Sequence, residues 1–292
     1  MTIRLTAPSK TFLCGEYGVL LGGPALVINT QPRFELLARL NQNQNAQHRF
    51  HKNSPAGILI AENLKVFSGL SIEFNDPHQG RGGLGASSAQ FLLVSALKSF
   101  LQDKAASYEE IWSDYQRVTA KSGSGVDVVS QYTGKIARIQ FSPLLAEAED
   151  WPYSEIGFVV LRTGNKVLTH KHLSSLERSR LETLKKISNS AFEAFDAESS
   201  EVFLAKVHQF SKSLKELGLE DFQTSSLIED LAQQDWYLAA KGCGAMGADT
   251  ILAFYPSEER KTVLDYAASM KLEVCATESD LSLGLEVTHE TR

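Results

Sequence analysis

Residues 80–90 read GRGGLGASSAQ and stand directly before an apolar run, FLLVSAL, at residues 91–97. Four of the first six residues in this stretch are glycines. Glycine loses more backbone entropy on folding than any other residue, so glycines this dense usually mark a close approach of the main chain to another group. The length and spacing of residues 87–101 predict that a buried helix follows the loop.

Two nucleotide-binding patterns can be compared with this loop. Gly80, Gly82 and Gly85 fit the GxGxxG pattern of dinucleotide-binding proteins. That pattern belongs in a tight turn directly after a strand of a βαβ unit, whereas residues 75–79 intervene here and the following helix leads into another helix. A Walker A loop needs a lysine where this chain has Ala86. An NAD-dependent oxidoreductase is therefore an alternative that rests on the glycine pattern alone.

The remaining interpretation is a helix N-terminus that binds an anion. Free amide N–H groups and the positive end of the helix dipole would face the ligand. The hydroxyls of Ser87 and Ser88 would add donors or metal ligands. An ordinary capped helix after a flexible loop is the structural alternative, and other segments of the chain decide between the two.

Composition and charge exclude several classes of protein. The chain has 292 residues, 43% of them hydrophobic and 22% charged, which is typical of a globular protein of one large or two ordinary domains. The net charge of −6 argues against a nucleic-acid partner, and no apolar run approaches the roughly 18 residues of a membrane span. Cys14, Cys243 and Cys275 are widely spaced, which favours a reducing compartment. We expect a cytoplasmic enzyme, monomeric or homodimeric, that acts on a small molecule and binds neither nucleic acid nor a membrane.

Strands and helices alternate along the chain in two halves. A turn-rich stretch at 141–155 separates the halves, so we predict an α+β fold with domains at residues 1–150 and 151–292. The expected strands cover residues 2–7, 18–30, 34–40, 156–162, 250–255, 272–276 and 283–288. The expected helices cover residues 87–101, 107–120, 174–197, 200–217, 221–235 and 257–270. A polar segment at 41–53 is interpreted as a surface hairpin.

Four segments together carry a resemblance to a known family. GGLGASSA (82–89) resembles the PxxxGLGSSA phosphate loop of the GHMP kinases, which include galactokinase, homoserine kinase, mevalonate kinase and phosphomevalonate kinase. APSKTFLCGEYGVLLGGPALV (7–27) is similar to the N-terminal signature of that superfamily, and KGCGAMGADTILAFY (241–255) to its C-terminal glycine loop. SGSGVDVVSQYTG (122–134) is the fourth match. The resemblance spans nearly the whole chain and implies a two-domain α+β kinase with the nucleotide between the domains.

The resemblance implies that ATP and Mg²⁺ are the cofactors. It assigns the metal ion to Ser88 and the nucleotide phosphates to the glycine loop. The implied nucleotide-binding residues are Gly82, Gly83, Gly85, Ala86, Ser87 and Ser88.

Two residues are the candidate catalytic groups. Asp127, in a glycine-serine turn, is expected to accept the proton of the substrate hydroxyl. The resemblance puts the ammonium group of Lys10 beside Asp127 and the transferred phosphoryl group, where it would keep the carboxylate ionised and stabilise developing charge. The structural alternatives are an aspartate that caps local amides and an exposed lysine at the end of a strand.

The resemblance also suggests which residues contact the acceptor substrate. Glu16 and Tyr17 either line the substrate or brace their turn. Residues 162–172 form a polar loop that either contacts an anionic substrate through Lys166, His170, Lys171 and His172 or is simply solvated. The expected substrate-binding residues are Glu16, Tyr17, Ser124, Thr163, Gly244 and Ala245.

Three short sequences favour the phosphomevalonate kinase branch of the superfamily. They are GEY at 15–17, GSGVDV at 123–128 and GAMGAD at 244–249. The expected reaction is ATP-dependent phosphorylation of 5-phosphomevalonate. The alternatives are a mevalonate kinase, another small-alcohol kinase of the superfamily, or a nucleotide-binding relative without catalytic activity.

The chain also departs from the family pattern. Ser9 and Met246 stand where the family has glycines, and Ala86 replaces a serine of the phosphate loop. Mevalonate kinases place a metal-binding glutamate eleven residues before the catalytic aspartate, and this chain has Gln116 there.

Overall fold

The computed structural model describes residues 2–41, 47–164, 178–196 and 199–290. Its strands are β1 (Thr2–Cys14), β2 (Ala25–Leu40), β3 (Leu70–Asn75), β4 (Ile136–Gln140), β5 (Leu145–Glu149), β6 (Ile156–Arg162), β7 (Ala239–Cys243), β8 (Thr250–Pro256), β9 (Glu273–Thr277) and β10 (Glu286–Glu290). Its α-helices are α1 (Pro55–Glu62), α2 (Leu64–Phe67), α3 (Ala86–Leu101), α4 (Tyr108–Val118), α5 (Val126–Thr133), α6 (Arg178–Asp196), α7 (Ser200–Glu216), α8 (Phe222–Leu231) and α9 (Arg260–Ser269).

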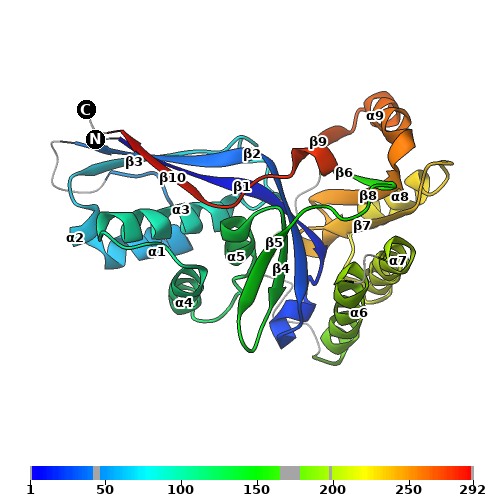
Figure 1. Cartoon of the computed structure of the whole chain (residues 1–292), viewed down its shortest axis with the longest axis horizontal. Helices are drawn as coiled ribbons and strands as arrows, with labels where there is room; N and C mark the ends of the chain where they lie inside the picture. Colours follow the sequence, from blue (N-terminus) through cyan, green and yellow to red (C-terminus); the bar gives the residue numbers. More distant parts are fainter. Residues whose placement is uncertain (1, 42–46, 165–177, 197–198, 291–292) are drawn as a thin grey trace.

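Two antiparallel sheets organise these elements. The first sheet has six strands in the order β10-β1-β2-β4-β5, with β3 paired to β2, and the second has the order β7-β8-β6-β9. Figure 1 shows the first sheet lying over helices α1 to α5 and the second sheet beside it with helices α6 to α9. The predicted α+β class is therefore confirmed. None of the helices within the described ranges is long and apolar enough to cross a membrane.

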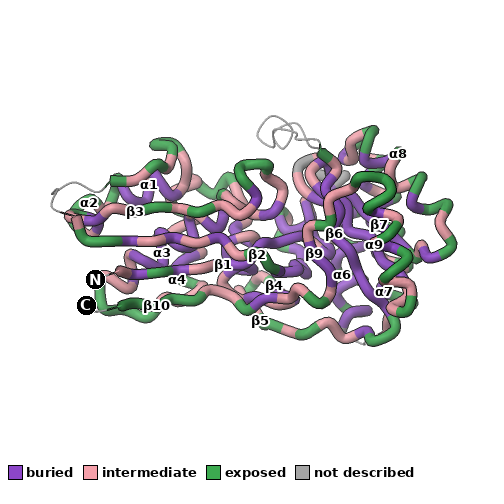
Figure 2. Tube along the Cα trace, turned by 90° about the horizontal axis from the view of Figure 1, so that it is seen from above, coloured by how far each residue is buried: buried purple, intermediate pink, exposed green. Residues whose placement is uncertain are grey.

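One face of the first sheet carries the core of the first half. Side chains alternate between the two faces of a strand, so Ile3 and Leu5 point into the core while Arg4 and Thr6 point away from it. Helix α3 supplies much of the opposing apolar surface, because every residue from 91 to 97 is buried. The predicted buried helix is thus confirmed, and Figure 2 shows buried stretches running through the interior of both halves.

The second sheet is covered by helices on both faces. Phe158 and Val160 of β6 pack in one apolar cluster with Phe192 of α6 and Phe203 of α7. The intervening residue, Val159, packs on the other face in a cluster that contains residues of α8 and α9. A strand buried on both faces needs an almost continuous apolar sequence, and β6 has one.

The last strand returns to the first sheet. β10 pairs antiparallel with β1, with Thr2 opposite Glu290 and Thr6 opposite Glu286. The expected boundary at residue 150 falls just after β5, but residues 286–290 complete the sheet of the other half. The exact domain limits stay a prediction.

The opening of the chain differs from the prediction of short strands joined by glycine turns. β1 continues beyond residue 7 to Cys14, and the single strand β2 replaces the two strands expected at 18–30 and 34–40. Gly18–Leu21 form a 3₁₀ helix before β2 begins. The chain must reverse here because β1 and β2 pair antiparallel. Gly22 ends the 3₁₀ turn in the left-handed region, with φ of 71°.

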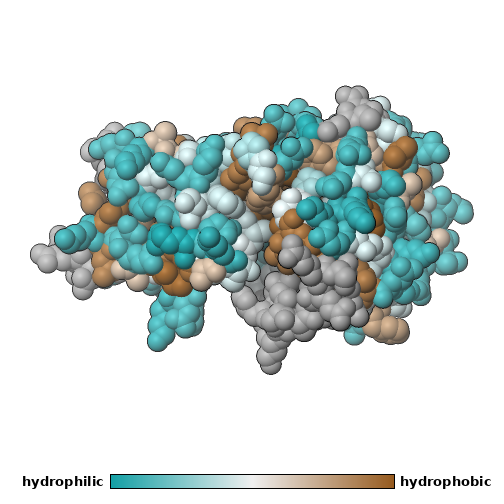
Figure 3. Space-filling view, turned by 90° about the horizontal axis from the view of Figure 1, so that it is seen from below, coloured by the Kyte–Doolittle hydropathy of each residue, from teal (hydrophilic) through white to brown (hydrophobic). Residues whose placement is uncertain are grey.

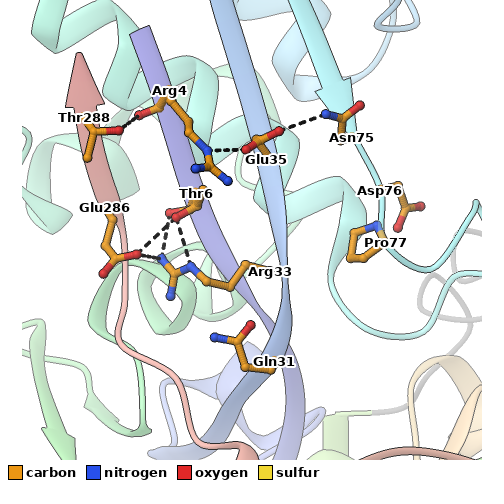
Figure 4. Close-up of a pocket in the computed structure, with 10 residues that line it drawn as sticks. All are labelled: Arg4, Thr6, Gln31, Arg33, Glu35, Asn75, Asp76, Pro77, Glu286 and Thr288. Atoms are coloured by element: carbon orange, nitrogen blue, oxygen red, sulfur yellow. Dashed lines mark hydrogen bonds and ion pairs between the residues drawn. The ribbon is translucent and has the colours of Figure 1, made fainter. Parts of the chain in front are cut away.

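Arg33 holds the returning segment against the first sheet. Its guanidinium donates to Ser282 Oγ at 2.7 Å, to the carbonyl oxygens of Leu283 and Gly284, and to Thr6. It also pairs with Glu286 on β10 at 3.1 Å, and its side chain is only 13% exposed. Figure 4 shows Arg33 between Thr6 and Glu286. One buried guanidinium therefore fastens the last strand to β1 and β2.

Arg33 also lines a pocket of about 510 Å³ that opens on the sheet face away from α3. Four of its charged groups form pairs, Arg4 with Glu35 and Arg33 with Glu286 (Figure 4). The fifth, Asp76, accepts from the backbone amides of His78 and Gly80. We therefore assign the pocket to the attachment of β10, and none of the predicted catalytic residues lines it.

We predict that Arg33→Gln lowers the free energy of unfolding by about 2 kcal/mol, because several hydrogen bonds to a charged donor are lost at a poorly hydrated position. Urea denaturation measures this change. Arg39→Gln is the matched control, since Arg39 is 51% exposed and pairs with a Glu73 that is 59% exposed, and an exposed pair contributes about 0–1 kcal/mol. Equal stability of the two variants would contradict the role given to Arg33.

Candidate active site

The glycine loop owes its composition to its backbone conformation. Gly80, Gly82, Gly83 and Gly85 have φ values of 75°, 80°, 85° and 90°. Residues with a Cβ rarely adopt this left-handed region. Helix α3 begins at Ala86, directly after Gly85, so the amide N–H groups of its first turn have no partner within the helix. The loop thus ends at the N-terminus of a helix, as the sequence predicts, and the binding of an anion there stays a prediction.

Gly85 also lies where three elements meet. A Cβ at this position would stand 2.7 Å from Lys10 Cγ and 2.9 Å from Gln131 Nε2. The Lys10 amide N–H donates to the Leu84 carbonyl at 3.0 Å, and the Gln131 side chain donates to the carbonyl oxygens of Pro8 at 2.7 Å and Gly85 at 3.2 Å. The end of the loop is therefore fixed to β1 and to α5.

The two predicted catalytic residues form an ion pair beside this loop. Lys10 Nζ lies 2.8 Å from Asp127 Oδ1, with side-chain exposures of 11% and 42%. Because Oδ1 is itself buried, the exposed part of the carboxylate is the side that carries Oδ2. The ammonium also lies 4.6 Å from the centre of the Phe12 ring. One carboxylate oxygen is thus held by lysine and the other faces solvent.

Asp127 lies in the first turn of helix α5, although a glycine-serine turn was expected there. The positive end of a helix dipole favours a carboxylate in this position. Gly125 caps the helix with φ of 77°. Helix α4 fixes the preceding turn, because Trp112 Nε1 donates to the Ser124 carbonyl at 2.9 Å and Gln116 Nε2 donates to the same oxygen at 3.0 Å. The position of Asp127 is therefore fixed by two side chains of α4 that bind the main chain of the preceding turn.

The residues present do not form a metal site of protein ligands alone. Gln116 braces the loop through its amide, which also donates to the Gly123 carbonyl at 2.8 Å. Ser88 is buried and its hydroxyl donates to the Gly85 carbonyl at 2.9 Å, whereas Ser87 is exposed. Across the described part of the chain, no group of three or more His, Cys, Asp or Glu side chains could hold a metal ion. The assignment of Mg²⁺ to Ser88 stays a prediction.

A second glycine loop, residues 243–249, meets the first. A Cβ at Gly83 would stand 2.5 Å from the Cβ of Asp249, and one at Gly244 would stand 2.1 Å from Asp249 Oδ2. Met246, which replaces a family glycine, keeps a left-handed backbone with φ of 56°. Ala245–Gly247 form a short 3₁₀ helix. Figure 3 shows apolar side chains where the two halves meet, within a largely hydrophilic surface.

The second glycine loop is held by hydroxyl groups of the second half. The Thr163 hydroxyl donates to the carbonyl oxygens of Ala248 and Asp249, the latter at 3.1 Å. The Thr224 hydroxyl donates to the Gly247 carbonyl at 3.0 Å. The expected substrate contacts of Thr163, Gly244 and Ala245 stay predictions.

Glu16 and Tyr17 reach this second loop from the first half. Glu16 forms an ion pair with Lys241 of β7, whose side chain is completely buried. Lys241 also donates to the Phe12 carbonyl at 3.2 Å, and the Tyr17 hydroxyl accepts a hydrogen bond from the Met246 amide at 3.3 Å. Both residues therefore have a bracing role, and their contact with substrate stays a prediction.

The surroundings of Lys241 favour its charged form. Burial by itself lowers the pKa of an ammonium group, but Cys243 and Glu16 beside it raise the pKa of Lys241 above its ordinary value. Burial also raises the pKa of Cys243 to about 11. The cluster therefore holds a charged lysine, its carboxylate partner and a neutral thiol at pH 7.

Ser9, the other departure from a family glycine, binds a buried histidine. Its hydroxyl donates to the Pro32 carbonyl at 2.7 Å and lies 2.6 Å from His78 Nε2. The other ring nitrogen, Nδ1, lies 3.4 Å from Arg162 Nη2. A guanidinium only donates, so Nδ1 accepts and the proton of the neutral ring is on Nε2. Burial, and next Arg162, keep the pKa of His78 below its ordinary value of 6.5.

Sequence patterns missed several residues of this site. Gln131, His78, Arg162 and Lys241 act through contacts with residues far away in the chain. Lys241 gave a weak signal, since a charged residue beside an apolar strand often has a buried partner. Lys166, His170, Lys171 and His172 lie outside the described residues.

Known proteins resemble this chain in sequence and in fold, although no family model matches it. The mevalonate kinase of Pyrococcus abyssi is 24% identical over 309 residues, covering 89% of this chain and 90% of the relative. The Streptococcus pneumoniae phosphomevalonate kinase matches in structure with a TM-score of 0.77 at 18% identity, covering 95% of this chain and 99% of that one. Lactococcus lactis galactokinase, complexed with galactose, matches with a TM-score of 0.74 at 14% identity, covering 98% and 95%.

Fold and sequence similarity together define an ATP-dependent phosphotransferase. The two-domain α+β architecture is shared with solved kinases over almost the full length of the chain. The chain is similar to GHMP kinases in sequence and in fold. The family resemblance and the fold class are thereby confirmed, whereas the roles of individual site residues stay predictions.

We predict that Glu16→Gln lowers the free energy of unfolding by about 3 kcal/mol, because it leaves the Lys241 ammonium buried without its carboxylate. The double variant Glu16→Gln/Lys241→Met should be more stable than the single variant, since it removes the unpaired charge. Thermal and urea denaturation measure both effects. A single variant with wild-type stability but weaker acceptor binding would instead assign Glu16 to the substrate.

We predict that His78 makes the fold sensitive to acid. The unfolded chain takes up a proton on His78 at a higher pH than the folded chain, since the folded pKa is lowered from 6.5. Its contribution to stability is therefore complete above about pH 6.5 and is lost as the pH falls through the lowered pKa. The charged groups that face this ring are Arg162, Asp76, Glu273 and Arg81.

Urea denaturation between about pH 7.5 and about pH 5.5 tests this expectation. The wild type should lose more unfolding free energy on acidification than His78→Gln. The exposed His208 provides the matched control, because His208→Gln should keep the wild-type pH dependence. An unchanged pH dependence in His78→Gln would contradict the prediction.

Proposed function

We propose that the chain transfers the γ-phosphoryl group of ATP to 5-phosphomevalonate. The observation that carries the proposal is the Lys10–Asp127 ion pair, at 2.8 Å, beside the N-terminus of α3. The GEY, GSGVDV and GAMGAD sequences support this acceptor, as does the structural similarity to the pneumococcal phosphomevalonate kinase, which is also known in complex with phosphomevalonate and AMPPNP. Mevalonate is the second candidate acceptor, supported by the sequence match to the Pyrococcus abyssi mevalonate kinase.

The glycine loop and the first turn of α3 would bind the ATP phosphates. Amide N–H groups at a helix N-terminus bind phosphate oxygens, and the helix dipole adds to the attraction. Gly82, Gly83, Gly85 and the amides of residues 86–88 supply these donors. The left-handed backbone of the three glycines lets the main chain approach the phosphates without a side chain in between.

Mg²⁺ would arrive with ATP. Protein Mg²⁺ sites commonly use one or two carboxylates together with substrate phosphates, and Asp127 and Asp249 are carboxylates beside the glycine loops. Among the loop hydroxyls, Ser87 is exposed, whereas Ser88 already donates to Gly85. The ion would neutralise charge on the phosphates.

Lys10 and Asp127 would act on the acceptor side of the transfer. The acceptor oxygen attacks the γ-phosphorus while the bond to the β-phosphate oxygen breaks, which leaves ADP. The phosphate oxygen of 5-phosphomevalonate is already anionic, so it needs no base, and the Lys10 ammonium that Asp127 holds in place would attract it. With mevalonate, the hydroxyl proton would pass to the exposed oxygen of Asp127. Lys10 would stabilise the charge that develops on the transferred group.

ADP release from Mg-ATP, with mevalonate and 5-phosphomevalonate in parallel, tests the proposal. Turnover on 5-phosphomevalonate should fall by about 10²–10⁴-fold in Lys10→Met, because a positioned charge is lost. Asp127→Asn should lose less on 5-phosphomevalonate than on mevalonate, since only the hydroxyl needs a base.

Lys261 and Asp265 offer a matched control pair. They form an ion pair on α9 with side-chain exposures of 90% and 68%, so Lys261→Met and Asp265→Asn should keep wild-type turnover. Turnover on mevalonate alone would replace the proposed acceptor. Absence of turnover on both acceptors would withdraw the named substrates.

A further inference from the structure

Arg162 reaches the glycine loop from the opposite half of the molecule. It is the last residue of β6, and its side chain is 8% exposed. Its Nη1 donates to the carbonyl oxygen of Gly82 at 3.0 Å. A guanidinium from the second sheet therefore holds the main chain of a loop that begins in the first half.

Other groups fix the direction of this guanidinium. Glu273 lies opposite Arg162 in the β6–β9 pairing, and its Oε2 accepts from Arg162 Nε at 3.2 Å. The same oxygen pairs with Arg81, the residue directly before Gly82. His78 Nδ1 faces Arg162 Nη2 at 3.4 Å. A planar donor fork that is held at several points has little freedom to turn away from Gly82.

The peptide that Arg162 holds is one that would otherwise rotate easily. Gly82 and Gly83 flank it, and neither has a Cβ to restrict its dihedral angles. In a trans peptide the carbonyl and the next N–H lie in one plane and point in opposite directions. When Arg162 fixes the Gly82 carbonyl toward β6, the Gly83 N–H is turned to the opposite side.

The two ends of the loop are held by different halves of the chain. Leu84 and Gly85 are bonded to Lys10 and Gln131 of the first half, and Gly82 is bonded to Arg162 of the second. Within the loop, the Gly82–Gly83 peptide is the one whose direction Arg162 fixes.

We propose that Arg162 is a positioning residue for the nucleotide, which turns the Gly83 N–H toward the ATP phosphates by holding the Gly82 carbonyl. The proposal rests on the proposed function, since it requires that the glycine loop binds ATP. Arg162 itself does not touch the nucleotide. It acts through the orientation of one peptide, so its loss should weaken ATP binding more than acceptor binding.

Calorimetric titration with ADP and a non-hydrolysable ATP analogue, in the presence of Mg²⁺, tests this role. Arg162→Gln should raise both dissociation constants at least about tenfold, because one donor to phosphate is misdirected. Arg162→Lys, which keeps a charged donor in reach of one acceptor, should recover part of the affinity. In steady-state kinetics the KM for ATP should rise while the KM for the acceptor changes less than about twofold.

Arg33→Gln is the matched control, because Arg33 is also largely enclosed, with a side chain 13% exposed, and binds the carbonyl oxygens of Leu283 and Gly284 rather than one of the glycine loop. It should lose stability and keep the wild-type affinity for ADP. A folded Arg162→Gln variant with wild-type affinity for ADP would overturn the proposal. Loss of affinity in both Arg162→Gln and Arg33→Gln would also overturn it, since the weaker binding would then follow from a general loss of stability and not from the orientation of the Gly82–Gly83 peptide.

A further variant keeps the test decisive if Arg162→Gln does not fold. Glu273→Gln removes the carboxylate that orients Arg162, at a residue whose side chain is 39% exposed. Weaker ADP binding by both Glu273→Gln and Arg162→Lys would support the positioning role, and wild-type affinity in both would refute it. If the wild type binds neither ADP nor the ATP analogue, the proposed function itself fails, which separates the two claims.

Discussion

A side chain at Gly85 would collide with Lys10 and Gln131, so β1, α3 and α5 can meet only around a residue that has no Cβ. That restriction brings the start of α3 beside the Lys10–Asp127 ion pair. Phosphate-binding amides and a charged pair consequently share one small region although they come from three separate segments. The second glycine loop is joined to the same region through the contact between Gly83 and Asp249.

The contacts described between the two halves of the site are polar and directional. Lys241 is buried against Glu16, the Met246 amide binds the Tyr17 hydroxyl, and the Gly82 carbonyl binds Arg162. Buried pairs of this kind often add less net stability than apolar packing of the same volume, because both groups lose their hydration. They do set distance and angle, so they fix how the two glycine loops face each other.

Local patterns predicted many of the helices and strands, because the information lies within a few residues, but they missed α1, α2, α5, β4, β5 and β7. The apolar run after residue 86 predicted the buried helix. The helix predicted from residue 107 is present as α4, where the Ser107 hydroxyl accepts from the Glu110 amide at 3.2 Å. The placement of Lys10 beside Asp127 followed only from the family resemblance. The role of Gln116 as a loop brace and the link from Arg162 to Gly82 could not be predicted, because each depends on a main-chain oxygen whose position the complete fold decides.

The pairing of β10 with β1 affects how the chain folds as it is made. β1 is synthesised first, yet one of its two neighbours in the sheet comes from the last strand (Figure 1). At about 5–20 residues per second, synthesis separates the two strands by tens of seconds. During that interval β1 has an open edge with unpaired N–H and C=O groups, which is the kind of surface that joins other chains. Closure of this edge of the sheet therefore waits until β10 has been made.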